Sequence, residues 1–276
     1  MLPLWRDQLR IGISPDAVVL IRIGKGLRPR IREKHIEKCQ PEPQEIWQAA
    51  LNTLTQLLAH KKWQDANATL TLSSHFVRYL LIPWHAEING EQEQAAYVKH
   101  RFNKVFGACA NHWTIRHSTA SANTPRLASG IDQALLEGIR QACQEGKLQL
   151  QSVQPYLMQS FNRHRHLFTP SVNWFVLAEY GKLIIAQFHN QTWQHISTHL
   201  FDNALLSDAL PVLLERQSTL SGIPNQPGKV WLYAPEHPKL SLPRNSKWVV
   251  QQLQPTSHIG LSFQESSQYA LVTGDN

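Results

Sequence analysis

The strongest constraint on the fold is that the two halves of this chain carry the same order of strand and helix patterns. Each half opens with three strand-like segments joined by short turns, within residues 9–36 and 173–200, and then continues with helices and further strands. No residue-by-residue repeat accompanies this order, so the symmetry lies in the pattern alone. The pattern predicts two related α/β lobes with a boundary between about Gly146 and Pro170.

The first three strands show how the pattern is recognised. Residues 9–13 alternate apolar and polar side chains, residues 14–16 (Ser-Pro-Asp) have turn chemistry, and residues 18–23 are a β-branched run. Residues 27–36 alternate Arg and Pro with apolar residues, which is typical of an edge strand. We therefore expect a meander of three antiparallel strands.

The rest of the chain supplies the helices and remaining strands. Helices are predicted where apolar residues recur every three or four positions, at 44–61, 90–106, 132–143, 155–167 and 203–220. Asp132 is the expected N-terminal cap of the third helix. Further strands are predicted at 68–82, 113–116, 126–131, 148–153, 228–233 and 248–253. The polar tail from Pro255 has no clear pattern and receives no element.

Length and cysteine content limit the class of protein. A chain of 276 residues buries enough surface to fold without disulfide or metal staples. Its three cysteines are an odd number with no CxxC pair, which fits a reducing compartment. No apolar run reaches the ~18–20 residues of a membrane span, and the start lacks the order of a signal peptide. We expect a globular cytoplasmic protein.

The positive charge is concentrated in one short segment. The chain has a formal net charge of +7. The segment from Arg22 to Lys38 holds seven Lys or Arg residues and two acids. Arg28, Arg30 and Arg32 are spaced by two, so a strand would project all three from one face. Two interpretations stay open: the row protects a sheet edge, or it faces an anionic membrane surface or an acidic partner.

Motifs that would indicate catalysis or a metal are absent from the sequence. It contains no GxSxG, no HExxH and no GxxxxGK[ST]. Its fourteen histidines do not fall at metal-ligand spacings with Cys or acidic partners. A platform that stacks nucleic-acid bases needs aromatic side chains among its basic residues. In the basic segment most residues between the charges are Ile, Leu and other non-aromatic residues, which argues against such a platform. We predict no catalytic residues, no metal site and no specific nucleic-acid partner.

Three segments have a recognisable sequence and order. They are Ile11-Gly12-Ile13-Ser14 followed by Val18-Val19-Leu20, the strand at 70–84 before the helix at 90–106, and Trp174–Gly181 with Leu183–Phe188. Together they resemble the actin-like assembly-platform proteins of type IV pili and type II secretion, the PilM, GspL and MshI family. The first and third are similar to the two phosphate-loop hairpins of that family. The resemblance spans roughly residues 9–235.

This resemblance implies a two-lobed α/β fold of the actin-like, duplicated ribonuclease H-like kind, each lobe opening with a β-meander. The first lobe would cover residues 1–150, with an inserted α/β segment at about 70–131, and the smaller second lobe residues 151–276. The implied function is a scaffold on the cytoplasmic face of the inner membrane. It would hold the cytoplasmic tail of a bitopic pilus or secretion protein.

The sequence departs from the nucleotide-binding members of the family. Ser14 stands where they carry a phosphate-loop Asp, and Glu179 and Gly181 replace Asp-x-Gly in the second hairpin. Gly12 remains, but Ala234-Pro235 follows the late strand where a glycine pair would approach adenosine. We interpret the chain as a pseudo-ATPase without cofactor. The alternatives are a working ATPase that uses ATP and Mg²⁺, or a basic nucleic-acid-binding protein.

Overall fold

The structure is a computed structural model that describes residues 6–26, 29–40, 45–88, 90–119, 121–169, 171–190, 192–202, 206–220, 229–237, 240, 246–255 and 260–273. Contacts between residues divide the chain into two compact units. Each unit is made of segments that are not consecutive in the sequence. Unit 1 comprises Met1–Val77, Ile131–Ser160 and Pro255–Asn276, and unit 2 comprises Arg78–Gly130 and Phe161–Gln254. The lobe boundaries expected from the sequence, 1–150 and 151–276, stay a prediction.

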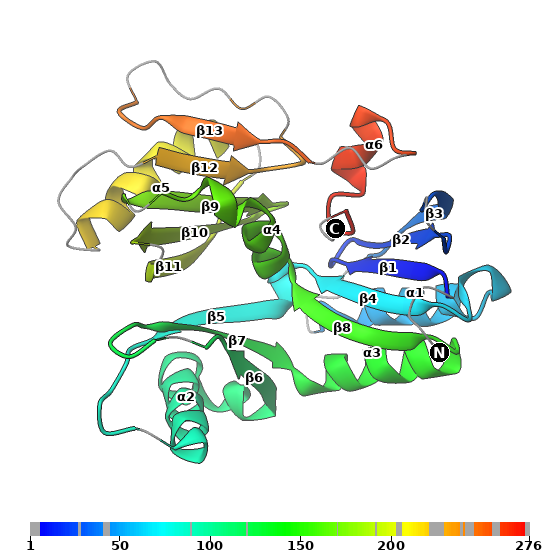
Figure 1. Cartoon of the computed structure of the whole chain (residues 1–276), viewed down its shortest axis with the longest axis horizontal. Coiled ribbons are helices and arrows are strands. Elements are labelled where there is room, and N and C mark those ends of the chain that lie inside the picture. Colours follow the sequence, from blue (N-terminus) through cyan, green and yellow to red (C-terminus); the bar gives the residue numbers. More distant parts are fainter. Residues whose placement is uncertain are drawn as a thin grey trace. The chain divides into compact units, whose positions relative to one another are not determined.

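Unit 1 is built on a five-stranded sheet (Figure 1). Its strands lie in the order β3-β2-β1-β4-β8. β1, β2 and β3 form the antiparallel meander, and β4 and β8 run parallel to β1. The strands are β1 (Gln8–Ile13), β2 (Ala17–Ile23), β3 (Ile31–Lys38), β4 (Asn67–Leu72) and β8 (Gln149–Pro155).

Unit 2 repeats this sheet with the same strand order and directions. The order is β11-β10-β9-β12-β13, in which β9, β10 and β11 are antiparallel and β12 and β13 run parallel to β9. The strands are β9 (Asn173–Glu179), β10 (Lys182–His189), β11 (Thr192–Leu200), β12 (Lys229–Tyr233) and β13 (Val250–Leu253). The prediction of a duplicated α/β architecture, each copy opening with a meander, is confirmed.

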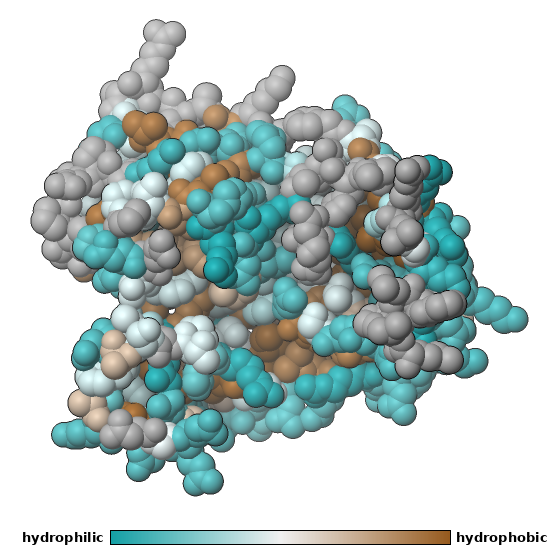
Figure 2. Space-filling view, viewed as in Figure 1, coloured by the Kyte–Doolittle hydropathy of each residue, from teal (hydrophilic) through white to brown (hydrophobic). Residues whose placement is uncertain are grey.

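Two helices pack together on the unit 1 sheet. They are α1 (Gln48–Leu58) and α3 (Gln133–Glu145). The Asp132 carboxylate accepts the Ala134 amide at 2.8 Å, so the predicted cap of α3 is confirmed. A Cβ at Gly138 would collide with Leu51, which shows how closely the two helices approach. Hydrophilic residues dominate the surface seen around these helices at the lower right of Figure 2.

The end of the chain returns to unit 1. A short helix, α6 (Phe263–Gln268), begins at Ser262 with a capping box to Glu265. Leu261, Tyr269 and Val272 pack against Val19 and Ile21 of β2. The sequence pattern predicts no element in this tail, although the Ser-x-x-Glu spacing of the capping box is visible in the sequence.

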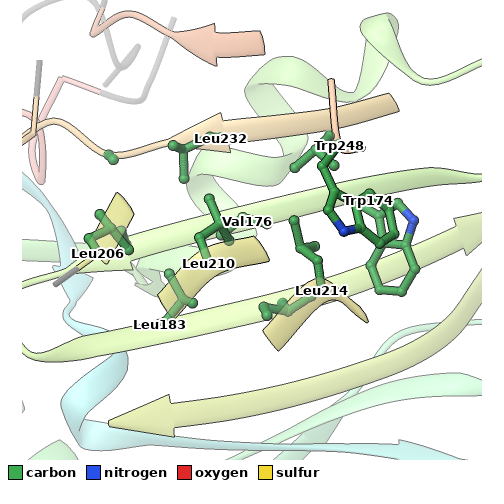
Figure 3. Packing of buried hydrophobic residues seen from close by; sticks show 12 residues of the cluster. Trp174, Val176, Leu183, Leu206, Leu210, Leu214, Leu232 and Trp248 are labelled. Carbon is green, nitrogen blue, oxygen red and sulfur yellow. The ribbon is translucent and has the colours of Figure 1, made fainter. Parts of the chain in front are cut away.

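The unit 2 sheet has different cores on its two faces. On one face α5 (Leu206–Leu220) contributes a row of leucines to an apolar cluster with strand residues, and the Trp174 and Trp248 rings meet edge to face at 5.7 Å (Figure 3). On the other face, Phe161 from α4 (Tyr156–His164) stacks on Phe188 at 4.8 Å. Phe168 follows the short 3₁₀ helix η5 (Arg165–Leu167) and joins this aromatic group.

A small three-stranded sheet with one helix forms a separate part of unit 2. Its strands β5 (Val77–Ile82), β6 (Trp113–His117) and β7 (Arg126–Asp132) lie in the order β5-β7-β6, beside α2 (Glu91–Phe106). Phe102 of α2 is fully buried against the Trp113 ring. Short 3₁₀ helices η2 (Lys61–Trp63) and η4 (Gly107–His112) complete the connections.

The strand predicted at 68–82 is interrupted in the structure. It divides into β4 and β5 around the 3₁₀ helix η3 (Ser74–Phe76), where the Ser73 hydroxyl accepts the His75 amide at 3.2 Å. The local cap therefore outweighs strand propensity at this point. Within the described parts of the chain, none of the helices combines the length and apolar character that a membrane crossing requires.

Candidate functional site

The first candidate phosphate-loop position, Ser14, lies in the turn between β1 and β2. Its hydroxyl donates to Asp16 Oδ1 at 2.7 Å and lies 3.1 Å from the Ala17 carbonyl oxygen. Asp16 also forms an ion pair with Lys38 at 3.3 Å. Burial tends to raise the pKa of Asp16, but the bond from Ser14 and the charge of Lys38 lower it overall. Ser14 and Asp16 thus hold the turn together through their own side chains.

The second position, Gly12, lies beneath the C-terminal segment. A Cβ at Gly12 would come within 2.9 Å of side-chain atoms of Leu271 and Val272. Glycine is therefore needed here because an apolar segment of the same chain approaches the strand closely. This packing explains Gly12 without any phosphate.

The second hairpin holds Glu179 and Gly181. Gly181 has φ +68°, the left-handed conformation that favours glycine in a tight turn. Glu179 and Lys182 are directly opposite each other across the hairpin, and both are buried. Burial, reinforced by the charge of Arg78, lowers the pKa of Lys182 to about 8, against the opposing effect of Glu179.

The residues at these two hairpins do not fit a Mg²⁺–nucleotide cradle. Mg²⁺ is usually held through carboxylates, and Ser14 supplies none. Gly12 faces apolar side chains, and Glu179 lies opposite a buried lysine. The late-strand position Ala234 is 1% exposed and belongs to the apolar core of unit 2, so it offers no close approach for an adenosine.

A buried carboxylate, Asp7, organises the cationic segment, and no sequence motif marks this residue. Asp7 is 6% exposed and accepts Arg22 Nε at 2.8 Å, Arg32 Nη1 at 3.2 Å and the Lys25 amide at 3.0 Å. Burial acts to raise the pKa of Asp7, but these bonds and the two arginine charges lower it overall. The hairpin register explains its position: Gln8 pairs with Ile23, which brings the preceding Asp7 beside these cations.

Two further cations of this segment are also paired. Lys34 bonds the Glu265 carboxylate, and this bond, with those from Ser262, lowers the pKa of Glu265 to about 2. Lys38 pairs with Asp16. Four of the seven cations between Arg22 and Lys38 therefore have acidic partners. The positive patch is weaker than the sequence alone suggests.

The three arginines proposed to face a membrane or an acidic partner have different surroundings. Arg28 lies outside the described residues. Arg30 is exposed just before β3 begins, and its carbonyl accepts the Gly24 amide at 2.9 Å. Arg32, whose side chain is 55% exposed, is bonded to Asp7. Their role stays a prediction.

The small sheet of unit 2 carries the surface hollows that the structure describes near α2. Two adjoining hollows share Gln94 and Arg126, whose side chains are hydrogen-bonded. Trp84, Ile88 and Tyr97 line the more apolar one. Within the part of the chain that the structure describes, no three His, Cys, Asp or Glu side chains converge as a metal site would require.

Comparison with known proteins places the fold. No protein-family model matches the sequence, and no curated protein sequence does. The cytoplasmic domain of EpsL, an inner-membrane component of the type II secretion system of Vibrio cholerae, aligns at a TM-score of 0.59 and 10% identity, over 98% of this chain and 96% of that one. A PilM–PilN type IV pilus biogenesis complex aligns at a TM-score of 0.67 and 12% sequence identity, over 97% of this chain and 96% of that one.

A third solved structure shares the fold. A protein of Bacteroides thetaiotaomicron with an actin-like ATPase fold and unknown function aligns at a TM-score of 0.59 and 10% sequence identity, over the whole of both chains. At these identities the likeness shows the fold. The two-lobed actin-like fold expected from the resemblance is confirmed.

Proposed function

We propose that this chain is a non-catalytic actin-like scaffold in the inner-membrane assembly platform of a type IV pilus or a type II secretion system. The observation that carries this proposal is the fold match over nearly the full length of both chains to EpsL and to PilM–PilN. The first is described as an inner-membrane component of a type II secretion system, and the second as a type IV pilus biogenesis complex. The same setting implies a location at the cytoplasmic face of the membrane.

The non-catalytic part of the proposal rests on the two hairpins. The Ser14 hydroxyl is engaged in its own turn, and the C-terminal segment packs over Gly12. Both groups are therefore engaged by other parts of the protein and are not left open to a phosphate. Loss of nucleotide chemistry leaves the two-lobed frame available for holding a partner.

The partner we propose is the cytoplasmic tail of a bitopic membrane protein. The shallow apolar surface at Trp84, Ile88 and Tyr97 offers a contact for an apolar side chain of such a tail. Arg126 and Gln94 beside it offer hydrogen-bond donors for backbone or carboxylate oxygens. A short extended peptide with one apolar anchor fits this chemistry.

Photo-crosslinking in the native cell tests the partner. An unnatural crosslinking residue at Trp84 should capture a single-span membrane protein that mass spectrometry identifies, whereas the same residue at exposed Glu137 on α3 serves as the matched control. Capture of a membrane protein at position 84 and not at 137 supports the proposal. Equal capture at both positions, or no membrane protein at either, contradicts it.

A contribution from the membrane surface is the second part of the proposal. Near an anionic leaflet each basic side chain contributes roughly 1 kcal/mol, which orients a tethered protein without anchoring it. Replacing Arg28 and Arg30 by Glu should therefore reduce sedimentation with anionic liposomes and leave the melting temperature nearly unchanged. Arg32 is left out because its reversal would place a second carboxylate beside Asp7. Unchanged sedimentation would leave edge protection as the role of these residues.

A further inference from the structure

Strand β11 forms one edge of the unit 2 sheet (Figure 1). Among the residues that the structure describes, it pairs only with β10. A strand edge presents backbone N–H and C=O groups that can pair with another strand, and proteins usually protect such edges with charges or with covering chain. The protection of this edge is therefore informative.

The equivalent edge of unit 1, strand β3, is protected in two ways. Its sequence IREKHIEK has five charged residues among eight. The C-terminal segment also reaches it, since Lys34 bonds Glu265 and Gly260 lies beside Ile31. In unit 1, the edge strand is thus protected both by charged residues and by the C-terminal segment.

Strand β11 has neither form of protection within the described residues. Its sequence TWQHISTHL contains no Asp, Glu, Lys or Arg in nine residues. Its last residue, Leu200, is 82% exposed. Among the described residues, the same position in the same topology is charged and covered in one unit, and is neutral with no chain paired along its outer side in the other. This difference points to a use for the β11 edge.

The geometry of β11 leaves a regular stretch for pairing. A bulge interrupts the ladder with β10 between Gln187 and Phe188, opposite the start of β11, and His195–Leu200 follows in regular register. His199 contacts Gln217 of α5 at 3.3 Å, so the odd-numbered side chains of this stretch face α5. Ile196, Thr198 and Leu200 project from the opposite face.

We propose that β11 is a self-association surface, on which β11 of a second copy of this chain pairs antiparallel to form a continuous ten-stranded sheet. A two-fold axis normal to the sheet relates the two copies, so that each face of one sheet continues into the same face of the other. Pairing centred on Ser197 or Thr198 then places only formally uncharged side chains opposite one another. The inference goes beyond the scaffold function and does not depend on it.

The size of this surface sets the strength of the dimer. A single pair of six-residue strands buries less than the roughly 1,200 Å² of a standard stable interface. The dimer should therefore be weak, with a dissociation constant in the range of about 10–100 µM. Such a dimer forms in solution only at high concentration and is favoured where copies are concentrated at one membrane.

Sedimentation equilibrium of the full chain over about 5–300 µM tests the proposal. The wild type should show a reversible monomer–dimer equilibrium. Thr198→Lys puts two like charges across the pair and should weaken the dimer roughly tenfold or more. Thr55→Lys, the same change at an exposed position of α1, should have no effect. A wild type that stays monomeric, or equal dimerisation of Thr198→Lys, overturns the proposal.

A proximity measurement keeps the test independent of stability. Thr198→Cys, in a Cys109→Ser background that removes the exposed native thiol, places two thiols across the pair. Cross-strand Cβ atoms lie about 5–8 Å apart in either register. A short bis-maleimide should therefore join the two copies at high concentration. Absence of the crosslinked dimer while sedimentation still shows a dimer would place the contact elsewhere and refute the β11 assignment.

Discussion

Replacing Asp7 by Asn removes the charge that holds the cationic meander together while keeping the shape of the side chain. Asp7 accepts three hydrogen bonds, two of them from Arg22 and Arg32. The Arg22 side chain is only 16% exposed, so the substitution leaves a largely buried guanidinium without its counter-charge. It still donates to the Lys62 and Gln64 carbonyl oxygens, which limits the damage.

The expected cost follows from these contacts. A hydrogen bond to a charged group contributes about 1.5–3 kcal/mol, and breaking a fully buried ion pair costs about 3–5 kcal/mol. Arg22 retains two carbonyl partners, and Arg32 is 55% exposed and contributes little. We therefore expect Asp7→Asn to lower the free energy of unfolding by about 2–3 kcal/mol and the melting temperature by about 4–8 °C at pH 7.

The effect depends on pH with a definite sign. Because the folded-state pKa of Asp7 lies below its ordinary value of 3.8, its stabilising effect is fully present well above pH 3.8. It is lost as the pH falls through the folded-state pKa, where the carboxylate is protonated. Wild type and Asp7→Asn should differ at pH 7 and converge in stability at the acidic end.

Urea denaturation at several pH values measures both effects, and Asp16→Asn is the matched control. Asp16 lies in the same sheet, but its side chain is 51% exposed and its partner Lys38 is 76% exposed. The control should lose no more than about 1 kcal/mol. Equal stability of Asp7→Asn and wild type at pH 7, or equal losses in the two variants, would refute the role assigned to Asp7.

Two further predictions concern packing. Gly138→Ala should destabilise the protein by about 1–3 kcal/mol in urea denaturation despite the better helix propensity of Ala, because its Cβ would collide with Leu51; a stabilised variant would contradict the α1–α3 contact. Cys143 is 1% exposed and burial raises the pKa of its thiol to about 11, whereas Cys109 is exposed. Ellman's reagent should therefore modify Cys109 rapidly and Cys143 only in denaturant, and rapid modification of Cys143 would show that its site is open.

The sequence predicted most of the architecture because local patterns and topology agree here. Alternating residues and turn chemistry predict hairpins around 14–16 and 181–182, and the structure has antiparallel strands on either side of both places, with Lys182 already in β10. Asp132 identified the start of α3 through its capping chemistry. The similar order of strands in the two halves then predicted two related sheets, and the strand orders match.

Contacts between distant segments were beyond these patterns. In the sequence Gly12 matches a degenerate phosphate-loop position, but in the structure it lies against Leu271, which is more than 250 residues away in the sequence. The tail around α6 is polar and short, so its packing on β2 leaves little periodicity to detect. Asp7 is a single acid before a strand, and its importance emerges only after the hairpin register is known. Long-range packing, rather than local propensity, decides all three.

Titration of the purified protein with Mg-ATP by isothermal calorimetry tests the central claim, that this actin-like fold is a scaffold independent of nucleotide. The engaged Ser14 hydroxyl and the covered Gly12 predict no saturable heat up to about 1 mM ATP, which corresponds to a binding free energy weaker than about −4 kcal/mol. A dissociation constant near 1 µM, about −8 kcal/mol, would contradict the account and make the chain a nucleotide-binding member of this fold.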